Sequence, residues 1–500
     1  MSVSRDNINN PRIISDQDGN LEKAKSDCEH IEVVEWTGSE ESRMRRKLDF
    51  RLVPIAFLLY LLCFIDRVNI GNARIQGLTT DLHLHGFQFN WALTIFFFPY
   101  MIIEIPSNLM LKYFGARYYL PALVVSFGTI SMCTAFVQNF DGLLAARFFL
   151  GIAEGGVIPG IAFYLSCFYK RHELLLRVVL FITGSSLAGA FGGLLAAGLA
   201  LIPDWGVEAM RMHTWRNIFF FEGVVTLILG FLSIRFLCSS AETATFLTQQ
   251  ERYIARERIN REHRESSREK TQWKHIRGAI FNWNNNMCGL GMCLSNISVQ
   301  SYSLFLPTIL SGLGYSAIKV QLYSVAPYAV ACCYSVAGAY ISDRFHRRGY
   351  FILVSTSLAI IGYTILVTVH DNNIKYLAVF FAAFGGFSNG PTFLAWGMNN
   401  ASGPTIRAVS SAYIVLLSNF GGIIATWIYL PRSRPNYYEG HFVNLGALCT
   451  IFILSNVIMA YCKWENKKRA NGERDGRAAG LNEHEKLALG YRNPDYRYTI

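Results

Sequence analysis

Long apolar stretches alternate with short polar connections along most of the 500-residue chain. Apolar runs of about 20 residues match the thickness of the hydrocarbon core of a bilayer. The pattern therefore predicts an all-α integral membrane protein with twelve transmembrane helices. We expect these helices to begin near Leu52, Trp91, Leu120, Gly142, Val178, Asn217, Asn284, Leu322, Tyr350, Tyr376, Ala408 and Phe442.

The charged side chains are few and unevenly distributed. They make up 16% of the chain, whereas 52% of the residues are hydrophobic, and soluble domains usually carry about 25% charged residues. This composition excludes a soluble enzyme and a disordered protein. Most charges fall in three polar stretches, which divide the chain into a cytoplasmic N-terminal tail, a six-helix bundle, a cytoplasmic central loop, a second six-helix bundle and a cytoplasmic C-terminal tail, at 1–50, 51–238, 239–282, 283–462 and 463–500.

The net charge of +11 is explained by topology rather than by nucleic-acid binding. Basic residues resist translocation and accumulate on the cytoplasmic side of a membrane. If the first helix starts inside, the short inner connections contain Lys112, Arg117, Lys170, Arg171, Arg177, Arg344, Arg347, Arg348 and Arg407. The outward loops then contain only Arg74, Arg211, Lys319, Lys375, Arg432 and Arg434. We therefore expect both termini in the cytoplasm.

The central loop and two short turns indicate a duplicated architecture. Thr248 and Glu251 form a capping-box pattern that predicts a surface helix to about Arg264, bridging the two halves. Basic turns follow the second and the eighth helix, at 112–117 and 343–348. Two similar bundles are typical of carriers that alternate access around a central site. The turns supply candidate gating residues, which are Lys112, Arg117, Asp343, Arg344 and Arg348.

Small residues recur every four positions in two of the predicted helices. The fifth helix carries Ser185, Gly189 and Gly193, and the eighth carries a similar stripe that includes Ser335. Such stripes allow close helix packing within a membrane, so we expect both at helix interfaces.

Catalytic and metal-binding patterns are missing from the sequence. The cysteines form no CxxC pair, and neither an HExxH nor a GxxxxGK[ST] motif is present. We therefore expect no enzyme activity, no bound metal and no cofactor. The coupling ion that we expect for a carrier is a proton.

The candidate chemistry lies in the few charges inside the predicted spans of the first half. A charge at the centre of a bilayer costs about 2.5–3.5 kcal/mol or more. Arg147 and Glu154 lie seven positions apart on one helical face, with Gly151 between them leaving room for a ligand or a neighbouring helix. Asp66 and Arg67 are consecutive, so they point toward different neighbours.

These charges permit the coupling of anion binding to protonation. An arginine binds a carboxylate with a bidentate fork, and a buried acid can exchange a proton when its arginine partner changes. Asp66, Glu154 and Glu104 are thus candidate proton carriers, and Arg67 and Arg147 are candidate anion ligands. Salt bridges that only hold the bundle together remain the alternative. For Glu222, near the outer start of its span, we expect a structural or gating role.

Neutral side chains of the second half could complete a substrate site. Asn296 and Gln300 lie four residues apart in the seventh helix, and Asn389 lies in a glycine-rich stretch expected to interrupt the tenth. Interrupted helices can expose backbone groups to a cavity. Each amide could equally join helices by interhelical hydrogen bonds.

Two strings in the first half resemble motifs of a known family. Asp66-Arg67-Val68-Asn69-Ile70-Gly71-Asn72-Ala73 is similar to the DRxNxxxA signature of the anion:cation symporters of the major facilitator superfamily. Residues 147–160 resemble their RxxxGxxEGxxxPG pattern, and the segments 215–223 and 246–252 resemble the allantoate permease branch, common in fungi. The resemblance spans residues 45–465.

The resemblance implies proton-coupled uptake of small organic anions, such as allantoate, nicotinate, pantothenate or biotin. Arg67 would be the carboxylate-binding arginine, with Asn69 in the same motif, and Asp66 and Glu154 would carry protons. Arg147 would be the charge partner exchanged as these acids titrate. The turn after the second helix departs from the superfamily pattern at Lys112 and at other positions. The resemblance therefore does not assign the charge network of the inner gate.

The resemblance thus implies a carrier in the plasma membrane that imports a small carboxylate, and we expect it to be monomeric. An internal membrane such as the endoplasmic reticulum is an alternative location. A non-transporting nutrient receptor on a carrier scaffold, and an exporter or facilitator of organic anions, are alternative functions.

Overall fold

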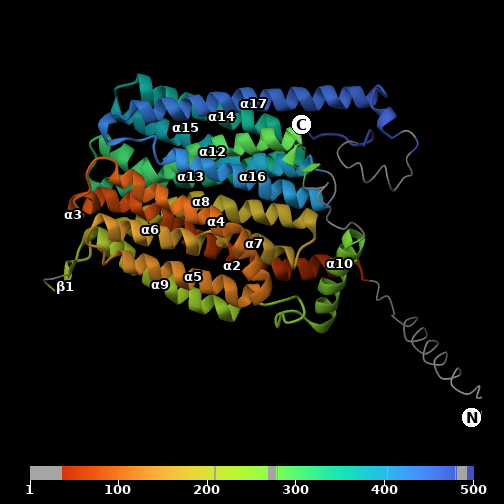
Figure 1. Cartoon of the computed structure of the whole chain (residues 1–500), viewed down its shortest axis with the longest axis horizontal. Coiled ribbons are helices and arrows are strands. Elements are labelled where there is room, and N and C mark those ends of the chain that lie inside the picture. The colour runs from red at the N-terminus through yellow and green to blue at the C-terminus, as the bar shows by residue number, and fades with distance from the viewer. Residues whose placement is uncertain are drawn as a thin grey trace, which may run out of the picture.

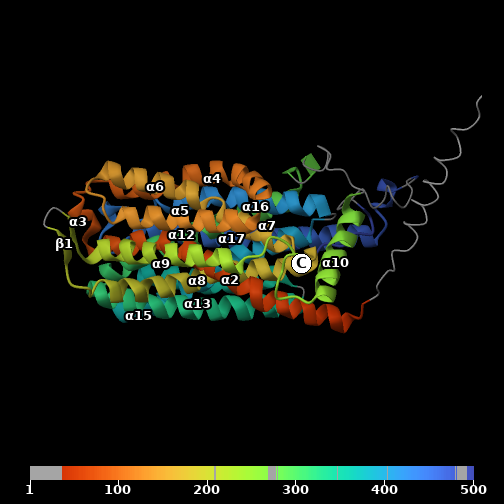
Figure 2. The same cartoon turned by 90° about the horizontal axis from the view of Figure 1, so that it is seen from below.

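The computed structural model describes residues 36–207, 210–267, 277–278, 280–345, 347–401, 404–478, 480 and 493–499. Long helices lie side by side along the longest axis of the molecule, as Figures 1 and 2 show. The helix α10 crosses one end of this bundle, and the short strand β1 marks the other. We call these the α10 end and the β1 end.

The first half contains the helices of the first six predicted spans. They are α2 (Gly38–Ala73), extended by the π-helical turn η1 (Arg74–Leu78) and by α3 (Thr79–Asp81), then α4 (Gln88–Phe114), α5 (Ala116–Thr134), α6 (Phe140–Glu154), α7 (Val157–Ser166), α8 (Arg171–Leu199) and α9 (Thr214–Phe236). A two-stranded antiparallel sheet of β1 (Trp205–Val207) and β2 (Met210–Met212) precedes α9. The fourth predicted span is divided into α6 and α7 at Gly155 and Gly156.

The second half follows the surface helix α10 (Gln249–Ser267). Its helices are α12 (Trp283–Gly312), α13 (Ala317–Phe345), α14 (Arg348–Thr368), α15 (Asn372–Asn399), α16 (Pro404–Ala425) and α17 (Tyr438–Ala470), with the 3-10 turns η2 (Pro431–Ser433) and η3 (Asp475–Arg477). In Figure 1 this half forms the upper part of the bundle and the first half the lower part.

The helices agree with the predicted succession of spans. Among the described residues, eight helical stretches are long and apolar enough to cross a membrane, and they correspond to α2, α6 with α7, α8, α9, α13, α14, α15 and α17. The helices α4, α5, α12 and α16 run alongside them (Figure 1). The expected all-α architecture is confirmed.

The two halves meet mainly where α8 packs against α13 and α15, α2 against α12, and α4 against α16. The expected stripe on α8 lies at the first of these contacts, because a Cβ on Gly189 would lie 2.5 Å from the Tyr328 ring of α13. Gly71 of α2 approaches α12 as closely, since a Cβ there would lie 2.5 Å from the carbonyl oxygen of Leu304. Ser335 of the α13 stripe faces α15 instead, with its hydroxyl 2.9 Å from that of Ser388.

The halves share a closed apolar core at the β1 end. It combines Ile70, Phe89 and Trp215 of the first half with Leu304 and Tyr429 of the second. Polar contacts between α4 and the end of α16 reinforce it, with the Asn90 amide donating to the Thr426 carbonyl oxygen at 2.6 Å. The structure is thus sealed at the β1 end.

The predicted capping box at the start of α10 is confirmed. The Glu251 carboxylate accepts from the Thr248 backbone N–H at 2.9 Å, and the Thr248 hydroxyl accepts from the Glu251 N–H at 3.3 Å. The helix ends at Ser267 rather than near Arg264. Ion pairs join it to the first half, through Lys47 and Glu251 at 2.6 Å and through Arg258 and Glu173 at 3.1 Å, and Arg256 pairs with Glu242 of the loop before it at 2.9 Å. The described contacts place α10 against the first half, and the prediction that it bridges the two halves stays a prediction.

The last described residues of the chain, 493–499, dock against the α10 end of the second half. The backbone carbonyl oxygen of Thr499 accepts from the Trp396 indole N–H at 2.9 Å, and its N–H donates to the Asn400 side chain at 2.8 Å. Arg469 of α17 donates to the Tyr496 carbonyl oxygen at 2.8 Å and pairs with Glu465 at 3.2 Å. The C-terminal segment is therefore held by side chains of α15 and α17.

Candidate functional site

The centre of the candidate site is an ion pair between two helices of the first half. Arg67 of α2 donates from Nη2 and Nε to Oε2 of Glu154, at the end of α6, at 3.0 and 3.3 Å. Arg67 is 7% exposed and Glu154 is fully buried. A charge pair withdrawn from water in this way interacts strongly, and loss of one partner leaves the other uncompensated.

Aromatic rings surround the guanidinium of Arg67. Its Cζ lies 5.0 Å from the ring centroid of Phe96 and 5.0 Å from that of Tyr100, both on α4. Cation–π contacts of this kind stabilise a cation in a site from which water is excluded. The Cys63 thiol donates to the same Glu154 oxygen at 3.3 Å. The Phe96 and Tyr100 rings thus contact the predicted anion ligand.

Asp66 faces a different helix from Arg67, as consecutive positions on α2 require. Its Oδ1 accepts a hydrogen bond from the Ser131 hydroxyl of α5. Its Oδ2 is buried and has no hydrogen-bond partner within the described part of the chain. The predicted divergence of the two side chains is confirmed.

Arg147 is buried near the pair without sharing its hydrogen bonds. Two of its nitrogens, Nε and Nη2, have no hydrogen-bond partner among the described residues. It interacts electrostatically with both Asp66 and Glu154, and its Cζ lies 5.8 Å from the centroid of the Phe219 ring. The site therefore holds a cation with two nitrogens, unpaired among the described residues, that could donate hydrogen bonds to an anion.

Close packing of α6 on α4 fixes the position of Glu154. A Cβ on Gly151 would collide with the Phe96 carbonyl oxygen, and one on Gly155 would lie 2.6 Å from that of Tyr100. The space left by Gly151 is thus occupied by a neighbouring helix rather than by a ligand. The same contact brings Glu154 beside the aromatic residues that flank Arg67.

Glu222 of α9 is a further buried carboxyl. It is 8% exposed, and neither of its oxygens has a hydrogen-bond partner in the described structure. Close packing of α9 on α5 buries this side chain, because a Cβ on the adjacent Gly223 would lie 2.5 Å from the Met132 backbone nitrogen of α5. Glu222 interacts electrostatically with Asp66, so it borders the cluster.

Other candidates lie at the contact between α4, α12 and α16. Asn419 of α16 donates to Glu104 at 3.1 Å, and Asn296 of α12 donates to the Ser418 carbonyl oxygen at 2.7 Å. Gln300, on the same helix as Asn296, is buried with its side-chain oxygen unpaired among the described residues. Glu104 therefore joins the two halves instead of pairing with Arg67.

Asn389 does not interrupt its helix, and that prediction is wrong. The helix α15 continues from Asn372 to Asn399. The Asn389 amide oxygen accepts from the Ser355 hydroxyl at 2.5 Å, and its nitrogen donates to the Thr356 hydroxyl at 2.9 Å. Because both partners lie on α14, this asparagine joins two helices. Gly385, four residues before it, permits close packing on α14 instead of a break, because a Cβ there would lie 2.5 Å from the Ala359 Cβ.

Asn69 is buried in the first half. Neither its amide nitrogen nor its amide oxygen has a hydrogen-bond partner among the described residues. A Cβ on Gly192 of α8 would lie 3.9 Å from that oxygen, so the amide faces α8.

The candidate gating residues lie at the α10 ends of the helices. Arg117 is half-buried near the start of α5, Arg344 is exposed near the end of α13, and Arg348 begins α14. The side chains of Lys112 and Asp343 fall outside the described residues.

Arg74 is a buried cation that sequence reasoning missed. It was expected in an outward loop, but the chain continues as the π-helical turn η1, and Arg74 is 6% exposed. Its Cζ lies 4.3 Å from the Phe89 ring centroid and 5.8 Å from that of Phe305. Its Nε and Nη1 have no hydrogen-bond partner in the described part of the chain. A charge placed one residue after an apolar span gave no signal of this burial.

Comparisons with known proteins agree with this architecture. The sequence profile of the Major Facilitator Superfamily matches residues 56–426. The chain belongs to the major facilitator superfamily. It is 31% identical over 472 residues to an uncharacterized transporter of Schizosaccharomyces pombe, covering 92% of this chain and 90% of that protein. It is 33% identical over 461 residues to the MFS-type transporter cnsO of Penicillium expansum, covering 89% of this chain and 87% of that protein.

Solved structures of distant members show the same fold. The inward open xylose transporter XylE of E. coli superimposes with a TM-score of 0.62 at 16% identity, over 81% of this chain and 95% of that one. A bacterial homologue of the human lysosomal transporter Spinster superimposes with a TM-score of 0.61 at 14% identity, over 85% of this chain and 97% of that one. This major facilitator is thus a multi-pass membrane transporter whose relatives include fungal transporters.

Proposed function

We propose that this transporter imports a small organic carboxylate together with a proton, as an anion:cation symporter of the allantoate permease branch. The observation that carries the proposal is the buried ion pair between Arg67 and Glu154. Beside this pair lies Arg147, two of whose nitrogens have no hydrogen-bond partner among the described residues, which supports a site for an anion.

The pair supports coupling by competition for one guanidinium. A substrate carboxylate that binds the fork of Arg67 displaces Glu154, because both acids use the same donors. Displaced Glu154 then lacks its counter-ion, which favours uptake of a proton. Substrate and proton thereby bind together, and release of either restores the ion pair.

Arg147 and Asp66 extend the same chemistry. Arg147 has unused donors and interacts electrostatically with both acids, so it can compensate whichever carboxylate is ionised. Asp66 is held by Ser131 and retains one unpaired oxygen. We therefore assign Arg67 and Arg147 to anion binding and Asp66 and Glu154 to proton transfer. We assign no proton-carrying role to Glu104, because it joins α4 to α16.

The contacts between the halves support alternating access. The sealed β1 end would face outward and the α10 end inward, toward the cytoplasm, as the basic residues at the α10 end favour. Movement of one half against the other would open the β1 end by separating α2 from α12 and α4 from α16. We place this movement in the plasma membrane.

The experiment that tests the proposal is uptake into proteoliposomes. The purified full chain is reconstituted, and radiolabelled allantoate, nicotinate and pantothenate are supplied with the inside alkaline, with equal pH on both sides, or with a protonophore. We expect at least one carboxylate to accumulate above its external concentration only with the gradient, and an uncharged amide analogue not to compete. Uptake equal under all three conditions would contradict proton coupling, and no uptake of any carboxylate would contradict the substrate class.

A further inference from the structure

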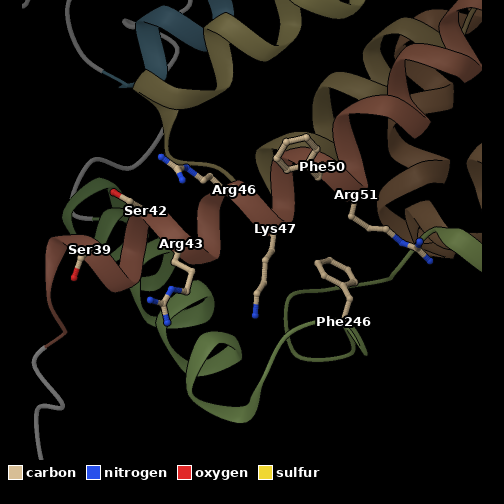
Figure 3. Close-up of a pocket in the computed structure, with 8 residues that line it drawn as sticks. All are labelled: Ser39, Ser42, Arg43, Arg46, Lys47, Phe50, Arg51 and Phe246. Atoms are coloured by element: carbon tan, nitrogen blue, oxygen red, sulfur yellow. The ribbon is translucent and has the colours of Figure 1, made fainter.

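A basic groove of about 700 Å³ lies at the α10 end, along the first turns of α2. It is lined by Arg43, Arg46, Lys47 and Arg51, together with Phe50, and by Phe246 from the segment before α10. Figure 3 shows Arg43 and Lys47 extending on the side of the helix that faces this segment. The groove lies outside the buried charge cluster of α2 and α6, since its residues occupy the opposite end of α2.

The cations of the groove are only partly neutralised. Lys47 pairs with Glu251 at 2.6 Å, and the Cζ of Arg51 lies 4.8 Å from the Phe236 ring centroid. Arg43 and Arg46 are exposed, and neither has an ion-pair partner among the described residues. No acidic side chain lines the groove within the described chain. The groove therefore presents positive charge to any anion that reaches it.

The other face of the same helical segment is fixed to the protein. Asp49 accepts from Arg177 at 2.7 Å, Arg45 pairs with Glu173 at 3.1 Å, and Leu48 is fully buried. The segment thus separates a structural face from a basic face. Because these contacts already fix the helix, the basic residues of the groove are available for a ligand.

Apolar side chains beside the cations place the groove at the surface of the membrane. Phe50 is 83% exposed and lies two residues before the start of the apolar stretch at Leu52. Arginine and lysine near the end of a transmembrane helix extend toward lipid headgroups while neighbouring aromatic rings lie against the acyl chains. A ligand with a phosphate group and an apolar tail would satisfy both parts of the groove, and basic clusters at this position attract anionic lipids.

We propose that this groove binds the phosphate-bearing headgroup of an anionic phospholipid in the leaflet at the α10 end. The phosphate is held by Arg43 and Arg46, and the acyl chains pass along Phe50. The inference rests on the membrane placement of the chain and not on its substrate. The topology proposed above makes this leaflet the cytoplasmic one.

Native mass spectrometry of the purified full chain tests the proposal. The protein is released from detergent containing equal amounts of phosphatidylcholine and phosphatidylinositol 4-phosphate, and the retained lipid is counted. The variant Arg43→Gln/Arg46→Gln is compared with Arg347→Gln/Lys467→Gln, which removes two exposed cations at the same end of the second half. We expect the groove variant to retain at least fivefold less phosphoinositide and the control variant to match the wild type.

Two further arms separate the sources of phosphate. Soluble inositol 1,4-bisphosphate should bind at least tenfold more weakly than the lipid, and Phe50→Ser should weaken retention of the lipid only. Equal affinity for the soluble headgroup would overturn the lipid as the ligand, and retention unchanged in Arg43→Gln/Arg46→Gln would overturn the site. An unchanged melting temperature of the variants shows that the protein remains folded. Because no arm measures transport, these outcomes are independent of carboxylate uptake.

Discussion

Arg67 and Glu154 form a buried ion pair across the contact of α2 with the end of α6, with Nη2 and Oε2 3.0 Å apart. The pair uses both Nε and Nη2 of the guanidinium on a single carboxylate oxygen. The other oxygen of Glu154 has no hydrogen-bond partner within the described structure. A substrate carboxylate that replaced Glu154 would gain the same donors, which is the exchange that we propose.

Replacement of Arg67 by lysine tests the need for a planar fork. Arg67→Lys keeps the positive charge opposite Glu154 but removes the bidentate geometry, and a hydrogen bond to a charged group contributes about 1.5–3 kcal/mol. We expect the Kd of the transported carboxylate to rise about tenfold or more, measured by scintillation proximity binding. The control Arg235→Lys changes an exposed arginine of α9 and should leave Kd unchanged. Equal affinity in Arg67→Lys would remove Arg67 from the anion site.

The closed β1 end depends on the absence of a side chain at Gly71. In Gly71→Val, the added carbons would overlap the Leu304 carbonyl, which a Cβ already approaches to 2.5 Å. We expect α2 and α12 to separate, which increases the distance between spin labels at Thr80 and Lys319 in a cysteine-depleted chain. Gly198→Val is the control, because no atom lies within 4 Å of a Cβ at that position. Identical distance distributions in wild type and Gly71→Val would show that this contact does not hold the end closed.

Asn389 should contribute to stability rather than to substrate recognition. Asn389→Ala removes two hydrogen bonds to α14, from the Ser355 hydroxyl and to the Thr356 hydroxyl, while Ser355 keeps its bonds to the backbone of its own helix. Interhelical hydrogen bonds in membranes contribute about 0.6 kcal/mol on average, so we expect a loss of about 1–2 kcal/mol in unfolding free energy and an unchanged KM. Asn456→Ala is the control, since that side chain bonds only to its own helix. A raised KM with unchanged stability would return Asn389 to the substrate site.

Docking of the C-terminal segment should weaken in acid. Burial opposes ionisation of Glu465, but hydrogen bonds from Arg474 and Arg469 outweigh it, so the pKa of Glu465 is lowered from 4.5. A carboxyl whose pKa is lowered by folding stabilises the folded form above its unfolded pKa, and this contribution is lost as the pH falls through the folded pKa. Protonation of Glu465 would release Arg469, which also donates to the Tyr496 carbonyl oxygen. We therefore expect the docking of residues 493–499 to persist at pH 5 to 7 and to loosen as the pH falls below 4.5, toward the lowered pKa of Glu465.

A spin label at Asp495 measures this release directly. Its mobile fraction should rise as the pH falls below 4.5, and Glu465→Gln should show the mobile spectrum already at pH 7. The control Glu473→Gln removes an exposed carboxylate that pairs with Lys468 and should behave as the wild type. A label that stays immobile in Glu465→Gln would show that Arg469 holds the segment without its acidic partner.

Much of the fold could be predicted because the bilayer imposes a simple pattern on the sequence. Apolar stretches fixed the succession of helices, and helical geometry placed Asp66 and Arg67 toward different neighbours. The hydrogen-bond partners of the buried charged residues could not be predicted in the same way, since they depend on which helices pack against each other. Ser131, the partner of Asp66, is one hydroxyl in an apolar span and looks like a packing residue.

The errors have physical causes as well. Arg74 follows the last apolar residue of its span, where charge usually marks a loop, yet the helix continues through a π-helical turn and aromatic rings cover the side chain. Asn389 lies among glycines, which favour either a break or a close contact between helices. Only the position of α14 distinguishes these two outcomes.

The central claim is that Glu154 couples proton uptake to anion binding through Arg67. It is tested most directly by Glu154→Gln in proteoliposomes, where carboxylate counterflow at equal pH and accumulation driven by an inside-alkaline gradient are measured in the same preparation. We predict that counterflow persists, because Arg67 still binds the anion, and that accumulation above the external concentration is abolished. Accumulation equal to that of the wild type would contradict the claim.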